Sequence, residues 1–133
     1  MPDDGEIIRR STDAYSRGDI DGFLELWAPE AVVDWSNSRG PDAGVYRGHD
    51  QIRGFVERFR GAFEEVRIEL VGDPEEISDG VWVVENVTHF RGRDGIEVKA
   101  GSAWVIELER GTQVSLTLHQ TKAEALDAAG GRG

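Results

Sequence analysis

Hydrophobic and polar residues alternate along the second half of the chain with the period of two that is typical of β-strands. The stretch from residue 80 to residue 118 is rich in β-branched and aromatic residues, and the steps Asp94-Gly95 and Arg110-Gly111 divide it into three segments. Asp-Gly is a strong hairpin signal, because glycine readily adopts the positive φ angles of a tight turn. The pattern therefore predicts three long antiparallel strands.

The alternation also predicts which face of each strand is buried, since successive side chains of a strand point to opposite faces. On the last strand, Val114, Leu116 and Leu118 form an apolar face, and Gln113 falls on the opposite face. The strand before it has an apolar face that begins at Trp104. The expected core residues of these two strands are Trp104, Ile106, Leu108, Val114, Leu116 and Leu118.

The strand at 81–91 carries apolar residues on both faces, so its buried face depends on its register with the next strand. A two-residue turn at Asp94-Gly95 with uninterrupted pairing would place Glu85 beside the core residue Trp104. One extra residue, as a bulge at Ala100-Gly101-Ser102, would instead place Asn86 opposite Trp104. We therefore expect Trp82, Val84, Asn86 and Thr88 to point inward, and His89 and Arg91 to point outward.

The first half of the chain shows apolar residues at helical spacing. Apolar stripes predict helices at 5–17, from Ile20 up to Pro29, and at about 48–63, with Trp27 on the apolar face of the second helix. Gly18 ends the first helix and Asp19 caps the second. Short strands are expected at 31–36 and 66–71, a polar loop up to Ala43, and a closing helix at 122–129. The order predicts a single α+β domain over residues 1–133, in which three N-terminal helices cover one face of a curved antiparallel sheet.

Composition and charge narrow the classes of partner. The chain has 133 residues with 26 acidic and 15 basic side chains, and its net charge of −11 argues against nucleic acid or an anionic membrane as a partner. It has no cysteine, its three histidines are far apart in sequence, and it has no glycine-rich phosphate loop. We therefore expect no metal site and no cofactor. Without a long apolar run or a basic N-terminal leader, the expected location is cytoplasmic.

Several stretches resemble a known superfamily in their order and spacing. They are Tyr15-Ser-Arg-Gly-Asp-Ile-Asp-Gly-Phe-Leu-Glu-Leu-Trp27, then Pro29-Glu-Ala-Val-Val-Asp34, Val45-Tyr-Arg-Gly-His-Asp-Gln-Ile52 and Lys122-Ala-Glu-Ala-Leu-Asp-Ala-Ala-Gly130. Together they resemble the SnoaL-like branch of the nuclear transport factor 2 superfamily over nearly the whole chain. The resemblance implies a cone-shaped fold, commonly dimeric, with a ligand cavity between helices and sheet. It implies no single activity, because members include isomerases, dehydratases, cyclases, hydrolases and non-catalytic binding modules.

Ketosteroid isomerase, another member of the superfamily, provides a comparison for proton-transfer chemistry. That chemistry needs an Asp base, with a Tyr and a protonated Asp as oxyanion donors. Along the shared pattern the three positions fall on Trp35, Ser11 and Trp104. Asp34 stands next to the base position but points away from the cavity if Val33 and Trp35 point inward. Asp34 is the candidate catalytic acid or base, and the alternative is a carboxylate that pairs within the following turn or loop.

Aromatic residues on the expected inward faces predict an apolar cavity. All four tryptophans fall on inward faces, and such a cavity suits a small, flat or greasy molecule. Polar inward candidates, Ser102 among them, either orient a ligand or satisfy one another or buried water. The candidate ligand-binding residues are Tyr15, Trp27, Trp35, Phe59, Trp82, Asn86, Thr88, Trp104, Leu116 and Gln120.

These candidates support two functions of different classes. The first is a domain that binds a small apolar or aromatic molecule, without catalysis. The second is a lyase, isomerase or cyclase that uses Asp34. The lack of a clear inward acid or base favours the first, because proton transfer needs a titratable group within reach of the substrate.

The outer face of the sheet predicts self-association. Its apolar residues point away from the N-terminal helices, and a monomer would expose them to water as a patch of the kind that marks interfaces. We therefore expect a homodimer through the outer sheet face. The residues of this expected patch are Val81, Val83, Val87, Ala103 and Val105.

Overall fold

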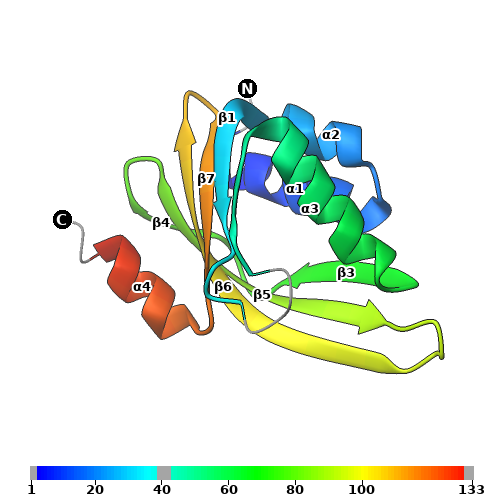
Figure 1. The fold of residues 1–133 in the computed structure, drawn as a ribbon. Helices are drawn as coiled ribbons and strands as arrows, with labels where there is room; N and C mark the ends of the chain where they lie inside the picture. Colours follow the sequence, from blue (N-terminus) through cyan, green and yellow to red (C-terminus); the bar gives the residue numbers. More distant parts are fainter. Residues whose placement is uncertain (1–2, 39–42, 131–133) are drawn as a thin grey trace.

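The computed structural model describes residues 3–38 and 43–130, and it places three helices on one side of a curved sheet and a fourth on the other side (Figure 1). The helices are α1 (Asp4–Arg17), α2 (Ile20–Glu25), α3 (Gly48–Gly61) and α4 (Lys122–Gly130). The strands are β1 (Trp27–Asp34), β2 (Val45–Arg47), β3 (Glu65–Leu70), β4 (Glu75–Ser78), β5 (Val81–Arg91), β6 (Glu97–Glu109) and β7 (Thr112–His119).

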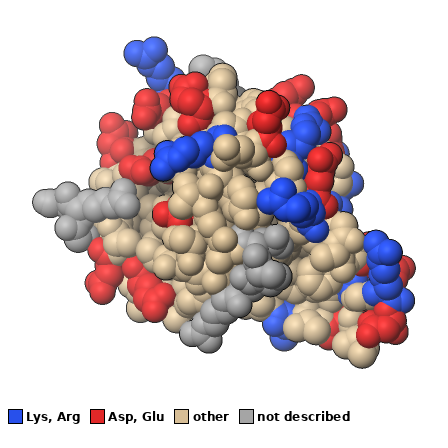
Figure 2. Space-filling model, in the orientation of Figure 1, with Lys and Arg blue, Asp and Glu red and all other residues tan. Residues whose placement is uncertain are grey.

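The sheet has the strand order β2-β1-β7-β6-β5-β3, with β4 paired to β5. Its described pairs are antiparallel except β1 with β7, which run parallel. The three N-terminal helices lie on the concave face, so the predicted α+β fold is confirmed (Figure 1). Acidic and basic side chains lie around the margins of the view in Figure 2, with uncharged residues across much of the middle.

The helix ends predicted at Gly18 and Asp19 form as the sequence indicates. A further cap, which was not predicted, is Asp3, whose side chain accepts a hydrogen bond of 2.8 Å from the backbone N–H of Glu6 at the start of α1. Gly18 ends α1 with φ +78°, a left-handed conformation that glycine adopts without a steric penalty. Asp19 caps α2 by accepting from the backbone N–H of Gly22 at 3.0 Å. These short-range signals fix where the helices on the concave face begin and end.

The second helix is shorter than its apolar stripe predicts. It ends at Glu25, and Trp27 begins strand β1 instead of the last helical turn. The backbone oxygen of Leu26 accepts a hydrogen bond of 3.1 Å from the backbone N–H of Gln113, which draws the chain into the sheet beside β7. This long-range pairing overrides the local helical pattern. The short strands β2 and β4 were not predicted, and residues 39–42 of the expected loop lie outside the described residues.

The register between β5 and β6 differs from the prediction, although the buried face is the expected one. The turn has three residues, Arg93, Asp94 and Gly95, closed by a hydrogen bond of 2.9 Å from the Gly92 N–H to the Ile96 oxygen. No bulge occurs at Ala100-Gly101-Ser102, and Trp104 lies opposite Val84 instead of Asn86. Because Val84 and Asn86 share a face, the inward set of β5 is unchanged.

One polar residue of β7 lies on the opposite face from the one predicted. Gln113 is almost fully buried on the cavity side, because an irregularity in the β6–β7 pairing shifts the register between Glu107 and Leu108. The prediction assumed that side chains alternate regularly through Gln113, without such a shift. The predicted turn at Arg110-Gly111 forms, with positive φ at both residues.

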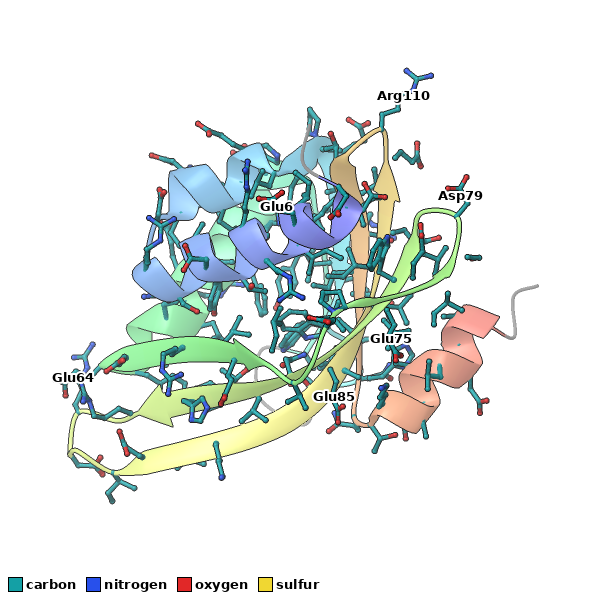
Figure 3. The ribbon with its side chains drawn as sticks, turned by 180° about the vertical axis from the view of Figure 1, so that it is seen from behind. Glu6, Glu64, Glu75, Asp79, Glu85 and Arg110 are labelled. Carbon is teal, nitrogen blue, oxygen red and sulfur yellow. The ribbon has the colours of Figure 1, made fainter. Side chains whose placement is uncertain are left out.

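Helix α4 covers much of the outer face that was expected to be exposed. Val83, Ala103 and Val105 are buried beneath Ala125 and Ala129 of α4, and together they form a second, smaller hydrophobic core. Seen from behind, α4 lies close to the strands near Glu75, whose carboxylate is 3.4 Å from the Lys122 ammonium (Figure 3). The expected exposed patch is therefore wrong for these three residues. Homodimerisation itself stays a prediction, but an exposed apolar patch at these residues no longer supports it.

Candidate functional site

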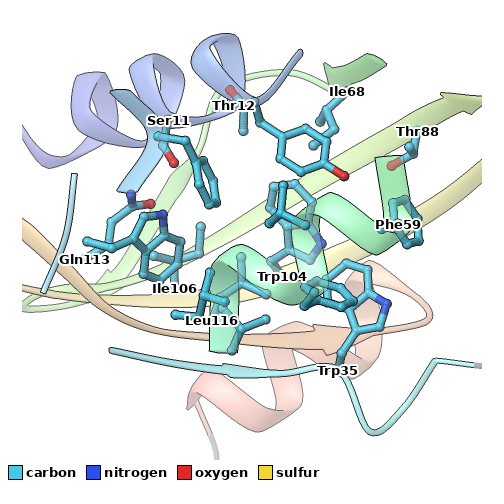
Figure 4. Close-up of a pocket in the computed structure, with 17 residues that line it drawn as sticks. Ser11, Thr12, Trp35, Phe59, Ile68, Thr88, Trp104, Ile106, Gln113 and Leu116 are labelled. Carbon is cyan, nitrogen blue, oxygen red and sulfur yellow. The ribbon is translucent and has the colours of Figure 1, made fainter. Parts of the chain in front are cut away.

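A cavity lies between the N-terminal helices and the concave face of the sheet (Figure 4). Its volume is about 60 Å³, and its surface is almost wholly apolar. It is lined from the helices by Ser11, Thr12, Tyr15, Phe23, Ile52, Phe55, Val56 and Phe59, from the sheet by Trp27, Val33, Ile68, Thr88, Trp104, Ile106, Gln113 and Leu116, and by Trp35 just after β1.

Aromatic rings in mutual contact form two parts of the cavity wall. On one side Phe23 lies between Tyr15 and Trp27, with ring centroids 5.7 Å and 5.9 Å apart. On the other side Trp35 contacts Phe55 at 5.4 Å and Phe59 at 6.4 Å. These edge-to-face and tilted contacts are the arrangements that aromatic side chains favour.

The second group of rings reaches the surface. Trp35 and Phe59 are only partly buried, whereas the other aromatic residues of the lining are buried. Trp35 follows the end of β1, and Phe59 lies in the last two turns of α3. Both side chains therefore combine contact with the cavity and contact with solvent.

Seven of the ten candidate ligand-binding residues line the cavity. They are Tyr15, Trp27, Trp35, Phe59, Thr88, Trp104 and Leu116, although the Trp27 assignment rested on a helix that is a strand in the structure. Periodicity alone therefore located the inward faces of α1, α3 and β6. The face of β5 also required an assumed register, and the face of β7 was predicted correctly except at Gln113. Contact of these residues with a ligand remains a prediction.

The other three candidates lie elsewhere. Trp82 packs at the start of α1, where a Cβ placed on Gly5 would lie 3.4 Å from its ring. Asn86 is fully buried and its side-chain oxygen accepts a hydrogen bond of 3.1 Å from Ser102 Oγ. Gln120 donates from Nε2 to the Asn37 oxygen at 2.6 Å and joins the end of β7 to the segment after β1. Asn86 and Ser102 thus satisfy each other, the alternative that the sequence left open.

Sequence reasoning missed part of the lining. Phe55 and Ile52 lie on the apolar stripe that predicted α3, so the signal was present although neither residue was proposed as a ligand contact. Gln113 had no such signal, because its inward position follows from the irregular pairing of β6 with β7. Its Nε2 donates to the Leu26 oxygen at 3.3 Å, beside the bond from its own backbone N–H.

Tyr15 is the one ionisable residue of the lining formed by the described residues. Burial raises the pKa of its hydroxyl far above the ordinary value, and nearby Arg60 opposes this with a smaller effect. Arg60 Nη1 donates to the backbone oxygen of Tyr15 at 2.6 Å, and its Cζ lies 5.3 Å from the centroid of the Tyr15 ring. Tyr15 is therefore a neutral side chain at physiological pH, able to donate a hydrogen bond but not to remove a proton.

The candidate catalytic residue Asp34 is not part of the cavity lining. Its Oδ1 accepts hydrogen bonds from the backbone N–H of Ser36 at 3.1 Å and from Ser36 Oγ at 2.5 Å. This geometry is that of an Asx turn, in which the carboxylate holds the backbone two residues later. It matches the turn-pairing alternative for Asp34.

The histidines also lie away from the lining. His49 Nε2 lies 2.9 Å from the Trp27 backbone oxygen, and His89 Nε2 lies 2.8 Å from Glu69 Oε1 on the exposed side of the sheet. Within residues 3–38 and 43–130, no group of three or more His, Cys, Asp or Glu side chains is arranged to hold a metal ion.

Two indole groups of the lining have no hydrogen-bond partner among the described residues. Trp27 Nε1 and Trp104 Nε1 are both buried and unpaired. A buried donor without a partner carries a free-energy penalty of roughly 1–3 kcal/mol, because it has lost its hydrogen bond to water. Both N–H groups lie on residues that face the cavity, one from β1 and one from β6.

Comparison with known proteins places the chain in a family. The model of the SnoaL-like domain matches residues 8–118, which is most of the chain. The chain belongs to the SnoaL-like family. The comparison with curated protein sequences finds no significant match.

Solved structures show the same fold at low sequence identity. An NTF2-like protein of unknown function from Burkholderia pseudomallei K96243 is 23% identical, with 97% of this chain and 98% of that chain covered and a TM-score of 0.77. RV0760c from Mycobacterium tuberculosis, in complex with estradiol-17β-hemisuccinate, is 14% identical, covers 90% and 95% and has a TM-score of 0.76. The Δ5-3-ketosteroid isomerase from Mycobacterium sp. is 17% identical, covers 89% and 92% and has a TM-score of 0.74. At sequence identities this low, the structural similarity establishes the fold of the SnoaL-like chain but not its activity.

No described helix of this family member is long and apolar enough to cross a membrane.

Proposed function

We propose that this SnoaL-like chain binds a small apolar or aromatic molecule in the cavity between its N-terminal helices and sheet, without acid–base catalysis. The observation that carries the proposal is the chemistry of the lining. Among the described lining residues there is no Asp, Glu, His, Lys or Arg, and the ionisable Tyr15 has a raised pKa. Proton transfer at neutral pH needs a group that can change its charge there, so this lining favours binding.

The size of the cavity limits the ligand or requires side chains to move. At about 60 Å³ the cavity is smaller than an apolar cavity of about 150 Å³ that accepts benzene. A larger ligand must therefore displace part of the lining. Trp35 and Phe59 are the side chains best placed to move, because both are partly exposed and neither is enclosed on all sides. We infer that a ligand enters between these two rings.

The unpaired indoles indicate which polar group the ligand carries. Trp27 and Trp104 each offer a buried N–H, and a carbonyl or ether oxygen in the cavity would accept from one of them. Aromatic walls with a few donors are typical of sites for planar, mostly apolar molecules. The complex of the related fold from M. tuberculosis with an estradiol ester supports this ligand class by analogy of fold.

Calorimetric titration with 2-naphthol and estradiol, followed by ligand-dependent thermal unfolding, tests the proposal. We expect binding that releases heat and raises the melting temperature, because a ligand that binds only the folded state stabilises it. Phe59→Ala should increase the affinity for estradiol relative to 2-naphthol, since it removes a ring from the entrance. Trp82→Phe is the matched control, because Trp82 lies outside the cavity lining and its substitution should leave both affinities unchanged.

Asp34→Asn separates binding from catalysis. The binding function predicts unchanged affinity, because Asp34 bonds to Ser36 and does not line the cavity. Turnover of a steroid-like, polyketide-like or epoxide substrate that falls about 10²- to 10⁴-fold in Asp34→Asn would contradict the proposal and establish acid–base catalysis. Failure of every cavity ligand to bind the wild type would contradict it as well.

A further inference from the structure

Part of β6 forms an open edge of the sheet. On one side β6 pairs with β5 from Glu97 to Glu107, but on the other side its pairing with β7 begins only at Ala103. The segment 97–102 therefore has no second neighbouring strand among the described residues. Figure 1 and Figure 3 both show this part of β6 along the border of the sheet, next to the hairpin that joins it to β5. An open edge presents unpaired backbone groups that can pair with another strand.

The hydrogen bonds of the hairpin identify the backbone groups that point outward. The Ile96 oxygen accepts from the Gly92 N–H, so Ile96 directs its backbone groups toward β5. Backbone groups of successive residues point to opposite sides of a strand. Glu97, Lys99 and Gly101 therefore direct their N–H and C=O groups away from β5, toward the open edge.

We propose that two copies of this chain pair through segment 97–102 of β6, antiparallel and about a two-fold axis at Val98. In such a pair, the residues whose backbone groups point toward the open edge must lie opposite each other, so only a few registers are possible. Centring the pair on Glu97 or on Lys99 would place like charges opposite each other. Centring it on Val98 places Glu97 opposite the partner's Lys99 and Lys99 opposite the partner's Glu97. Opposite charges directly across two strands stabilise the pair, and like charges destabilise it.

The side chains on the concave face fit the same register. Ile96 and Val98 are 63% and 59% exposed, an unusual state for large aliphatic residues beside a paired strand. In the proposed dimer Val98 meets the partner's Val98, and Ile96 meets the partner's Ala100. Pairing would thus remove these apolar side chains from water and also satisfy the backbone edge.

Charge at this end of the molecule permits the contact despite the net charge of −11. Acidic and basic side chains lie next to one another at the hairpin end, at the lower right of Figure 2. General repulsion between two acidic chains is screened beyond about 8 Å at physiological salt, while directly opposed pairs remain in contact. A lysine on an edge strand often discourages pairing. Here Glu97 lies two residues before Lys99, so Lys99 of one copy can pair with Glu97 of the other copy.

Charge exchange tests the register. Glu97 and Lys99 are exposed, so their substitution leaves the core intact. In sedimentation at about 0.15 M salt, wild type should be dimeric, and Glu97→Lys or Lys99→Glu alone should weaken association about ten-fold or more. An equimolar mixture of the two variants should form heterodimers, because every opposed pair is again of opposite sign. The double exchange should restore the homodimer. A monomeric wild type, or a dimer unaffected by either single change, would overturn the proposal.

Cross-linking supplies an independent measurement, made clean by the absence of native cysteine. In the proposed register the two Val98 Cα atoms are about 4.5 Å apart, within the range of a disulfide. Val98→Cys should therefore form a covalent dimer under mild oxidation. Ala100→Cys is the matched control on the same face, because the two copies of residue 100 lie about four residues out of register and cannot join. Equal cross-linking of both variants would refute the register. Neither test depends on the ligand function.

Discussion

Replacement of Arg60 by alanine should lower the free energy of unfolding by about 2–3 kcal/mol, because one guanidinium joins three elements around the cavity. Its Nη1 donates to the Tyr15 oxygen at the end of α1 at 2.6 Å and to the Val66 oxygen in β3 at 3.3 Å. A hydrogen bond from a charged donor contributes roughly 1.5–3 kcal/mol, and the longer one contributes less. The contact of Arg60 Cζ with the Tyr15 ring, at 5.3 Å, adds about 0.5–1 kcal/mol. Because Arg60 is partly exposed, we expect the sum to lie toward the lower end of these ranges.

Urea unfolding of three variants measures this contribution. Arg58→Ala is the control from the same helix, because Arg58 is exposed and its Cζ lies 5.8 Å from the Tyr46 ring. It should cost no more than about 0.5–1 kcal/mol. Arg60→Lys should lie between the two, since an ammonium can keep one of the backbone bonds but not the fixed fork of the guanidinium. If Arg60→Ala and Arg58→Ala differ by less than about 0.5 kcal/mol, the joining role of Arg60 is refuted.

Two further stability measurements follow from the structure. Gly80→Ala should lower the free energy of unfolding by about 1–3 kcal/mol, because Gly80 has φ +75° and a Cβ there would lie 2.6 Å from the Leu108 oxygen. Gly101→Ala is the control, because the nearest atom to a Cβ at Gly101 is 3.9 Å away, and it should change the free energy of unfolding by less than about 0.5 kcal/mol. An equal loss at both sites would contradict the regular pairing of β6. The folded pKa of Tyr15 is raised, so its stabilising contribution is complete below the ordinary tyrosine pKa near 10 and is lost as the pH rises from there toward the folded pKa. Unfolding free energies measured from pH 9 to 12 should therefore fall more steeply in wild type than in Tyr15→Phe, and parallel curves would exclude a buried, neutral Tyr15.

Helix boundaries set by local hydrogen bonds could be predicted from the sequence, whereas boundaries set by distant strands could not. Gly18 and Asp19 act on residues within a few positions of themselves, and both predicted ends form as local chemistry dictates. Trp27 follows an equally regular apolar stripe, but its backbone enters the sheet beside Gln113, which is far away in sequence. A helical period cannot report such a partner, because strand pairing is a property of both segments.

The face of each strand was more predictable than its register. Alternation puts Trp82, Val84, Asn86 and Thr88 on one face of β5 but does not say which face is inward. The prediction chose this face by assuming a bulge, and the structure keeps it with a three-residue turn and no bulge. Gln113 could not be placed in this way, because the irregular pairing beside it turns its side chain to the other face of the sheet, and no feature of the sequence predicts that irregularity. The burial of Val83 was also hidden, because the pattern of α4 shows an apolar face but not the surface that receives it.

The loss of acid–base groups and the small volume of the cavity have a common cause in three positions. By the family resemblance, the proton-transfer and oxyanion positions of ketosteroid isomerase fall on Trp35, Ser11 and Trp104, and the structure places all three in the cavity lining. Two of these positions thus carry an indole in place of a carboxyl group. An indole fills more space, donates one hydrogen bond and does not ionise at neutral pH. The same residues that remove the chemistry therefore narrow the cavity to about 60 Å³. If the chain binds a ligand as proposed, we expect the site to select it by shape and by one hydrogen bond that the ligand accepts, and we expect movement of Trp35 to set how large that ligand can be.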